Sequence, residues 1–438
     1  MQGETTRLPA PRRSRVLHLR PGEGAAAALG FAYFFALLCG YYVLRPLREE
    51  MGIRGGVENL PWNFTATLVA MIAALPLYSS LVARLPRARA VPLVYRFFLL
   101  NLVAFFALVR LGVAPRPVAR AFFVWVSVYN LFVVSVFWSF LADLFTSEQA
   151  KRLFGFVAAG GSAGAIAGPA VAGLLVRPLG VANLLLVSAV LLEIATQAAR
   201  GLVRWSRASG ASDVRAAEGR AEAGGEALGG GALGGIGPVF RDRYLAGIAA
   251  QMLLFTLGTT LLYVHTARLV AAAIPDSARR TTLFASVDLA VNVAALLTQS
   301  LATGALVGRL GLGVALAFVP LLSATGFAVA AAFPAFAVLA ALQALRRAAS
   351  YAVERPAREV LFTVVTREEK YKSKAFIDTV VYRAGDAGSA WLAQGLASAG
   401  VGISASMLAG VPFGVVGLAL AVWLARRQAG REAARPAA

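Results

Sequence analysis

Two stretches of the sequence place arginine and tyrosine at spacings of three and four, which puts them on one face of a helix. The residues are Tyr41, Arg45 and Arg48 in the first stretch, and Arg347, Tyr351, Glu354 and Arg358 in the second. Guanidinium groups bind phosphate or carboxylate oxygens through two parallel N–H donors. Both stretches therefore predict binding of an anionic solute. We expect Arg48 and Arg347 to clamp it from two sides, with the phenol rings stacking on it or shaping the wall around it. Because Arg45 and Arg48 lie near the end of an apolar segment, they are also candidates for snorkelling to lipid headgroups.

Further polar residues fall inside apolar segments and are candidates for the same solute path or for ion coupling. The solute candidates are Trp138, Tyr263 and Arg383, and the coupling candidates are Glu49, Asp288, Glu354 and Asp386. Asp288 could instead make a hydrogen bond between helices. The sequence contains no Cys/His cluster, no nucleophile elbow and no Gly-rich phosphate loop with a following lysine. We therefore expect neither an enzyme nor a metal or other cofactor.

These side chains must be held by membrane helices, because the composition is that of a chain built for lipid. Apolar residues make up 58% and charged residues 15%, and the mean hydropathy is +0.69. About 20 apolar residues span the hydrocarbon, and segments of that length predict twelve spans. They lie near 25–44, 62–84, 91–112, 118–142, 153–176, 180–199, 244–268, 280–304, 306–331, 334–353, 375–398 and 403–425. The fold class predicted is an all-α integral membrane protein.

The net charge of +20 would suggest nucleic acid in a soluble protein. Here it indicates orientation, because loops kept in the cytoplasm collect Lys and Arg. Basic residues gather before span one and after spans two, four, six, ten and twelve, so both termini are expected in the cytoplasm. Partners are then the bilayer and a small solute, not nucleic acid, and we expect a monomer in a bacterial inner membrane. With Cys39 as the single cysteine, an intramolecular disulfide is impossible.

The chain divides into two halves of six spans. A Gly/Ala-rich stretch within 201–243 has few large apolar residues and reads as a cytoplasmic linker. It separates a bundle at 25–200 from a bundle at 244–426, with tails at 1–24 and 427–438. Two phrases recur in the same order in both halves, at Ser79 and Thr303 and at Leu144 and Leu361. Two parallel six-helix repeats around a central cavity are the plan of major facilitator transporters.

Charged residues cluster where spans four and five join, and again at the matching place in the second half. They are Asp143, Glu148, Lys151 and Arg152 in the first cluster, and Glu369, Lys372, Lys374 and Asp378 in the second. We expect them to form ion pairs between helices that close a cytoplasmic gate, although a solvated surface is the simpler alternative. In the following span, Gly164, Gly168 and Gly173 would let the helix approach a neighbour closely, and they also resemble a motif of major facilitator exchangers.

Three stretches together resemble the ATP/ADP translocase family of bacteria and plastids. They are "YYVLRPLREEMG" with Arg45, Arg48 and Glu49, "FWSFLADLFTSEQAKRLFGF" with Trp138, Glu148, Lys151 and Arg152, and "RPAREVLFTVVTREEKYKSKAFIDTVVYRAGDAGS" with Lys374, Asp378 and Arg383. The resemblance implies an antiporter of nucleotides such as ATP and ADP. The sequence differs from the family at Arg48, where lysine is usual, and at Asp386, where nucleotide exchangers commonly carry lysine. These differences leave the substrate open between a nucleotide and another organophosphate.

Two other functions remain possible from the sequence. One is a proton-coupled major facilitator transporter of a non-nucleotide solute, with Asp288, Glu354 and Asp386 as proton carriers. The other is a membrane receptor or scaffold that transports nothing, although the linker lacks a recognisable signalling module.

Overall fold

The computed structural model describes residues 23–84, 87–208, 232–301 and 303–434. The N-terminal tail with its arginines, most of the expected linker and the last four residues lie outside this part of the chain. Within it, every regular element is a helix, as the apolar segments predict. Ten of these helices are long and apolar enough to cross a membrane.

The first half is a bundle of six long helices. They are α1 (Glu23–Arg54), α2 (Leu60–Arg84), α3 (Arg87–Arg110), α4 (Pro115–Leu144), α5 (Ser147–Leu179) and α6 (Asn183–Ala208), with a 3₁₀ turn at Val57–Asn59. The helix α6 continues eight residues past the boundary expected at 200. The apolar residues show which part of the helix lies in the hydrocarbon, but they do not show where the helix ends. The helix continues beyond them because its backbone hydrogen bonds also form in the aqueous layer.

The second half has the same plan with more interruptions. It contains a 3₁₀ turn (Ala232–Gly235), α8 (Ile236–Arg241), α9 (Arg243–Ala273), α10 (Ser277–Leu301), α11 (Thr303–Ala332), α12 (Phe336–Ala349), α13 (Arg355–Leu361), a 3₁₀ turn (Phe362–Val364), α14 (Arg367–Phe376), α15 (Tyr382–Ser398), α16 (Ile403–Leu408) and α17 (Val411–Ala433). Two π turns, Ser350–Glu354 and Ile377–Val381, join α12 to α13 and α14 to α15. The tenth and eleventh expected spans are thus continuous helical paths, 336–361 and 367–398. The end of the expected linker is helical, from 232 onward.

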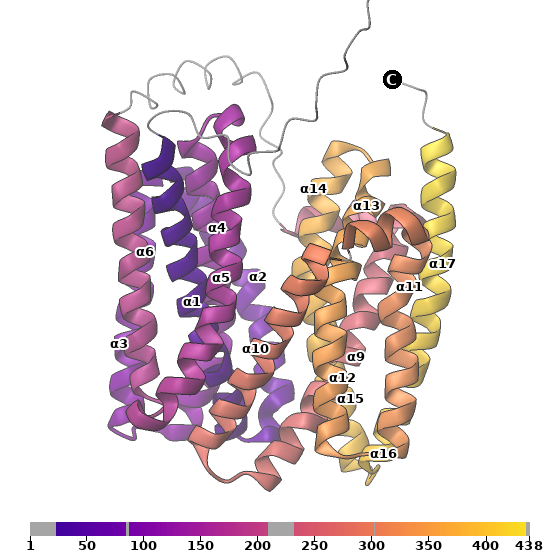
Figure 1. Ribbon diagram of the computed structural model, residues 1–438. Helices are drawn as coiled ribbons and strands as arrows, with labels where there is room; N and C mark the ends of the chain where they lie inside the picture. The colour runs from indigo at the N-terminus through magenta and orange to yellow at the C-terminus, as the bar shows by residue number, and fades with distance from the viewer. Residues whose placement is uncertain (1–22, 85–86, 209–231, 302, 435–438) are drawn as a thin grey trace, which may run out of the picture.

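The two halves stand side by side and meet through α5 with α10, α2 with α15, and α1 with α10. Figure 1 shows them diverging toward the end where α1 begins and α17 ends. We call that end the termini face and the other end the opposite face. Since α1, α5 and α9 run away from the termini face and α10 runs back toward it, the charged helix ends near 147–152 and 367–374 belong to the termini face.

Close packing of α5 on α1 explains the glycine-rich string. A Cβ atom at Gly164 would lie 2.4 Å from the Phe35 carbonyl oxygen, and one at Gly168 would lie 2.7 Å from the Cys39 carbonyl oxygen. Only glycine allows the two backbones to come this close. Gly173 faces Ala285 of α10, so the same string also supports the contact between the halves.

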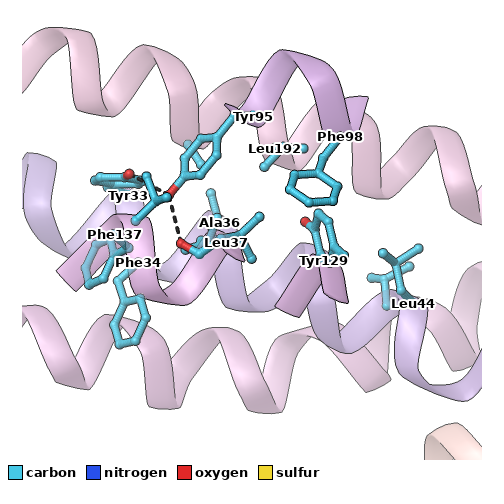
Figure 2. Packing of buried hydrophobic residues seen from close by; sticks show 14 of the residues in the cluster. Tyr33, Phe34, Ala36, Leu37, Leu44, Tyr95, Phe98, Tyr129, Phe137 and Leu192 are labelled. Atoms are coloured by element: carbon cyan, nitrogen blue, oxygen red, sulfur yellow. Dashed lines mark hydrogen bonds between the residues drawn. The ribbon is translucent and has the colours of Figure 1, made fainter. Parts of the chain in front are cut away.

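The core of the first half is aromatic. Tyr33, Phe34 and Phe137 pack together, and the Tyr33 hydroxyl lies 2.6 Å from the Tyr95 hydroxyl, which donates to the Val133 carbonyl at 3.1 Å (Figure 2). The hydroxyls of Tyr33 and Tyr95 thereby both have a polar partner, as a low-dielectric interior favours.

The internal repeat has a local structural counterpart. The helices α5 and α14 both begin with a capping box, in which Thr146 pairs with Gln149 and Thr366 pairs with Glu369. Each threonine hydroxyl accepts from the backbone N–H three residues on, which satisfies a donor that the helix leaves open. The phrase at Leu144 and its partner at Leu361 therefore mark the same helix start in the two halves. The phrase at Ser79 and its partner at Thr303 fall on side chains outside the described set.

Candidate functional site

Arg45, Asp288 and Arg347 form a buried ion cluster where the two halves meet. Nη1 of Arg347 donates to Oδ1 of Asp288 at 2.8 Å, and Nε of Arg45 lies 3.6 Å from Oδ2 of the same carboxylate. Arg45 belongs to α1 in the first half, whereas Asp288 on α10 and Arg347 on α12 belong to the second half. Asp288 is 3% exposed. Two guanidinium groups from opposite halves thus share one carboxylate inside the membrane region.

The cluster has more hydrogen-bond donors than acceptors. Nε and Nη2 of Arg347 are buried and have no hydrogen-bond partner, and neither has Oδ2 of Asp288. A buried donor without a partner costs about 1–3 kcal/mol, and more when it is charged, so each of the two open donors calls for an explanation. One carboxylate against two guanidinium groups also leaves a net positive charge. Both properties suit an anion.

Tyrosine rings surround this cluster. The Arg45 guanidinium lies over the Tyr42 ring at 5.6 Å, and Tyr41 packs edge-on against Tyr42 at 5.2 Å. Tyr351, in the π turn after α12, lies beside both Arg45 and Arg347. The expected residues Tyr41, Arg45, Arg347 and Tyr351 are therefore brought together by α1, α10 and α12.

A cavity of about 250 Å³ lies next to the ion cluster, between α1, α5, α10 and the π turn. Polar and aromatic side chains dominate its wall: Tyr42, Ser162, Asn292, Gln299, Tyr351 and Arg355. Gln299 donates to the Tyr351 carbonyl at 2.9 Å and Asn292 to the Ala165 carbonyl at 2.6 Å. The second contact joins α10 to α5, so this cavity also lies between the halves.

A second polar cluster joins α1 to α9 and α15. Asp386 is 5% exposed, accepts from the Thr260 hydroxyl at 2.7 Å and from Arg383 at 3.1 Å, and lies near Arg48. Arg48 stacks on the Phe123 ring at 3.7 Å and lies 3.3 Å from Glu49. The charge of Asp386 is thus offset by Arg383 in its own helix.

Tyr263 completes this second cluster. Its ring packs edge-on against Phe64 at 5.6 Å, and its buried hydroxyl has no hydrogen-bond partner in the described structure. Glu49, the carboxylate close to Tyr263, also has one buried oxygen without a partner. Arg48, Glu49, Tyr263, Arg383 and Asp386 form this cluster, which is separate from the one around Arg45. Arg48 and Arg347 therefore do not share a clamp here.

Arg346 and Glu354 point into the interior of the second half. Arg346 is 3% exposed, donates to the Ser323 hydroxyl at 2.9 Å, and lies between the Phe255 and Phe327 rings at 5.6 and 5.4 Å. Together with Gln251 and Glu354 it lines a cavity of about 20 Å³, which has room for about one water. Glu354 ends the π turn Ser350–Glu354 and lies near Arg346.

The opposite face carries a contact between the halves that the sequence did not indicate. Glu50 of α1 is 1% exposed. It accepts from Nη2 of Arg280 at 2.8 Å, from Nε of Arg280 at 2.5 Å and from the Ser277 hydroxyl at 2.6 Å. Nearby, Trp62 and Trp391 pack edge-on at 5.0 Å, and the Trp391 indole donates to Thr65 at 3.1 Å. We call Glu50, Ser277 and Arg280 the latch. Arg280 follows Arg279 and a loop, and only the folded chain brings it to Glu50.

Arg152, Arg358 and Lys374 on the termini face each make an ion pair within their own half. Arg152 lies 2.6 Å from Glu23 and 3.8 Å from Glu148. Lys374 lies 2.6 Å from Glu359, and Arg358 lies 3.3 Å from Asp378. Asp143 and Lys151 are exposed. The ion pairs of Arg152, Arg358 and Lys374 therefore join segments of one half, as between α1 and α5, while the latch joins the two halves at the other end.

Two expected residues lie away from these clusters or have another role. Trp138 packs against Phe34, Phe137 and Phe154 in the aromatic core of the first half, so its ring shapes that core. Glu354 faces the interior of the second half. In the part of the chain that the structure describes, no group of three His, Cys, Asp or Glu side chains is arranged to hold a metal ion.

The comparisons with known proteins rest on structure. No protein-family model matches the chain, and no curated protein matches its sequence. A bacterial homologue of the iron transporter ferroportin, in its inward-facing state, has a TM-score of 0.64 at 13% identity, over 94% of this chain and 99% of that chain. A bacterial homologue of the human lysosomal transporter Spinster, inward-facing and unoccupied, has a TM-score of 0.57 at 11% identity, over 94% of this chain and 99% of that chain. The nucleoside transporter NupG has a TM-score of 0.58 at 12% identity, over 93% of this chain and 100% of that chain. The chain therefore shares the all-helical fold of these transporters, in agreement with the all-α membrane fold predicted from the sequence.

Proposed function

We propose that this protein is a secondary transporter that moves an anionic organic solute, such as a nucleotide or another organophosphate, by alternating access. The observation that carries the proposal is the cluster of Arg45, Asp288 and Arg347, with its unpartnered guanidinium donors at the junction of the halves. In a water-poor site an anion is attracted to such a cluster more strongly than in bulk water. Binding at the junction also couples the solute to movement of one half against the other.

In this proposal, the described state is closed at the opposite face by the latch and accessible from the termini face. Support comes from the helices diverging toward the termini face (Figure 1) and from the inward-facing states of the ferroportin and Spinster homologues. With both termini in the cytoplasm, as the basic loops predict, the site is open inward. The membrane is then a bacterial inner membrane, and the transporter acts as a monomer.

We assign the charges on the termini face to a gate that forms in the other state of the transporter, in which this face is closed. When the halves close there, Asp143, Glu148, Lys151 and Arg152 can meet Glu369, Lys372, Lys374 and Asp378 across the junction. Because these helix ends carry both signs in each half, they can exchange their pairs within a half for pairs between halves. Ion pairs exposed to water are each worth little, which suits a gate that must open and close.

The experiment uses the full chain in liposomes loaded with unlabelled ADP. Labelled ATP, ADP and other phosphorylated solutes are offered outside, with and without a proton gradient. Exchange that needs internal solute and no gradient supports the proposal. Absence of uptake for every anion tested, with intact protein by size-exclusion chromatography, contradicts it.

The latch offers a separate test of alternating access. Removing Arg280 leaves the buried Glu50 carboxylate without its cation, which costs about 3–5 kcal/mol in comparable buried pairs. In an Arg280→Ala variant with spin labels at Asn59 and Ser398, in a Cys39→Ala background, distances at the opposite face should lengthen. An unchanged distance distribution would show that the latch does not hold this face closed.

A second candidate is a proton-coupled transporter of a non-nucleotide solute. The favouring observation is that Asp386 and Glu354 are 5% and 2% exposed inside the second half, and that one Glu354 oxygen has no hydrogen-bond partner. Buried carboxylates are typical of proton relays. Uptake that stops when the proton gradient is removed, and that Asp386→Asn abolishes, would favour this candidate.

A further inference from the structure

The two free donors of Arg347 lie on the same edge of its guanidinium group. Nη1 is engaged by Asp288, while Nε and Nη2 are buried and unpartnered. This edge presents two parallel N–H bonds, the geometry that binds a phosphate or carboxylate in bidentate fashion. Asp288 therefore orients the guanidinium through one corner and leaves its bidentate edge open.

Tyr351 belongs both to the surroundings of the ion cluster and to the cavity wall. It lies beside Arg45 and Arg347. It also lines the cavity and carries the Arg355 guanidinium over its ring at 4.4 Å. The residue belongs to a π turn, and π turns are local insertions that recur at functional sites. Gln299 of α10 donates to the Tyr351 carbonyl. A movement of α10 relative to this helix therefore also displaces Tyr351.

The charges select the class of anion. Arg45 and Arg347 against Asp288 leave one positive charge, and Arg355 on the cavity wall adds a second. A phosphate monoester carries about −1.5 to −2 at neutral pH and offers three acceptor oxygens, enough for Arg347, Arg45 and Arg355 together. A nucleoside triphosphate carries more negative charge than these three arginines and Asp288 balance.

The cavity limits the rest of the solute. Its volume of about 250 Å³ lies below the roughly 300–1,000 Å³ of sites for drug-sized ligands. Its wall offers the side chains of Ser162, Asn292 and Gln299 together with two phenols, which suit hydroxyl groups. A compact, hydroxylated body fits this wall better than a purine with its ribose.

We infer that the open edge of Arg347 is the seat of one phosphate monoester of a small hydroxylated body, and that the Tyr351 ring caps this seat until the solute displaces it. The inference rests on the proposed function and narrows it to sugar-phosphate-sized solutes. It assigns the phosphate to Arg347 with Arg45 and Arg355, and the body to the cavity between α5 and α10.

The first test measures chemical modification of Arg347 by phenylglyoxal in the full chain in nanodiscs, by peptide mass spectrometry. Glucose 6-phosphate should slow this modification at least tenfold, while ATP and succinate should slow it less than threefold. Tyr351→Ala, which removes the cap, should speed modification of Arg347 severalfold without ligand, and Tyr351→Phe, which keeps the ring, should not. Equal rates in the wild type and Tyr351→Ala overturn the cap.

The second test measures binding of glucose 6-phosphate by calorimetry. Losing a charge-assisted bidentate contact costs about 1.5–3 kcal/mol, so Arg347→Ala should bind roughly ten- to a hundredfold more weakly. Arg347→Lys, which keeps the charge but loses the two parallel N–H donors of the guanidinium group, should also weaken binding about tenfold. Arg279→Ala removes an exposed arginine and should bind as the wild type does.

The outcomes separate this inference from the proposed function. If ATP or succinate binds more tightly than glucose 6-phosphate and still depends on Arg347, the inference fails and anion transport stands. If no anion protects Arg347 and none is exchanged in liposomes, both fail. Because the protection assay uses the wild-type protein, it decides the question even where a variant does not fold.

Discussion

The interiors of the two halves are built from different chemistry. In the first half, the buried core is aromatic and glycine-rich, and the buried charged residues among those described, Glu23 and Glu50, lie near helix ends. In the second half, Asp288, Arg346 and Asp386 are buried within the membrane-spanning helices, and both π turns occur there. The first half is thus suited to act as a rigid body, and the second half to hold the charged groups and to change shape around them.

The largest expected effect tests whether the second half depends on its buried charges for stability. Arg346→Met removes the guanidinium from Ser323 and leaves Glu354 without the nearby cation. Breaking a buried charge arrangement from one side costs about 3–5 kcal/mol. The double variant Arg346→Met with Glu354→Gln should recover most of the loss in thermal unfolding. If the single variant is as stable as the wild type, the contrast between the halves has no energetic basis.

The next effect tests the glycine contact in the first half. Gly164→Ala places a Cβ atom 2.4 Å from the Phe35 carbonyl oxygen, and overpacking of this kind costs about 1–3 kcal/mol. Gly155→Ala in the same helix meets nothing within 4 Å and serves as the control. The buried thiol of Cys39 lies in α1, so its reaction with a fluorogenic dye during heating reports the first half directly. Equal dye curves for both variants would contradict the packing argument.

A smaller effect distinguishes the two tyrosines of the aromatic core. Tyr95→Phe removes the group that links the Tyr33 hydroxyl to the Val133 carbonyl, and it should destabilise by about 1–2 kcal/mol. Tyr33→Phe leaves the bond from Tyr95 to Val133 in place and should cost less. The dye assay on Cys39 measures both, and uptake per folded molecule should stay unchanged in each. If either variant lost uptake while keeping the stability of the wild type, this core would take part in transport and not only in stability.

The smallest effect concerns the start of the second half. Partial burial raises the pKa of the Asp242 carboxyl, but the Arg431 guanidinium at 2.7 Å and the Tyr244 backbone N–H outweigh it and lower the pKa. A lowered folded-state pKa adds stability above the unfolded value of about 4, and this is lost as the pH falls through the folded pKa.

Since this pair is partly exposed, its contribution is at most about 1 kcal/mol. Asp242→Asn keeps the helix cap and removes the charge, so it should lower the unfolding temperature slightly at pH 7 and by less at pH 3. A difference of the same size at both pH values would assign the effect to the cap and not to the ion pair.

The sequence by itself determined the helical membrane fold and its division into two halves. Apolar segments of about 20 residues leave the backbone no alternative to a helix in lipid. The capping residues Thr146 and Thr366 determine where α5 and α14 begin, because these signals are local. The spacing of Tyr41, Arg45, Arg347 and Tyr351 also singled out both arginines of the ion cluster and two tyrosines beside it, since polar groups inside apolar spans need a polar environment.

Tertiary structure alone decided which of these residues meet. The sequence placed Arg48 with Arg347, but the rotation of α1 turns Arg48 toward Phe123 and the Asp386 cluster, and turns Arg45 toward Asp288. The latch between Glu50 and Arg280 joins residues 230 positions apart, and no local pattern encodes such a pair. The π turn that holds Tyr351 beside Arg347 and in the cavity wall packs against α10 and α11. Helix formation follows from local hydrogen bonding in lipid, whereas pairing between helices depends on their relative rotation and register, which only the packed bundle fixes.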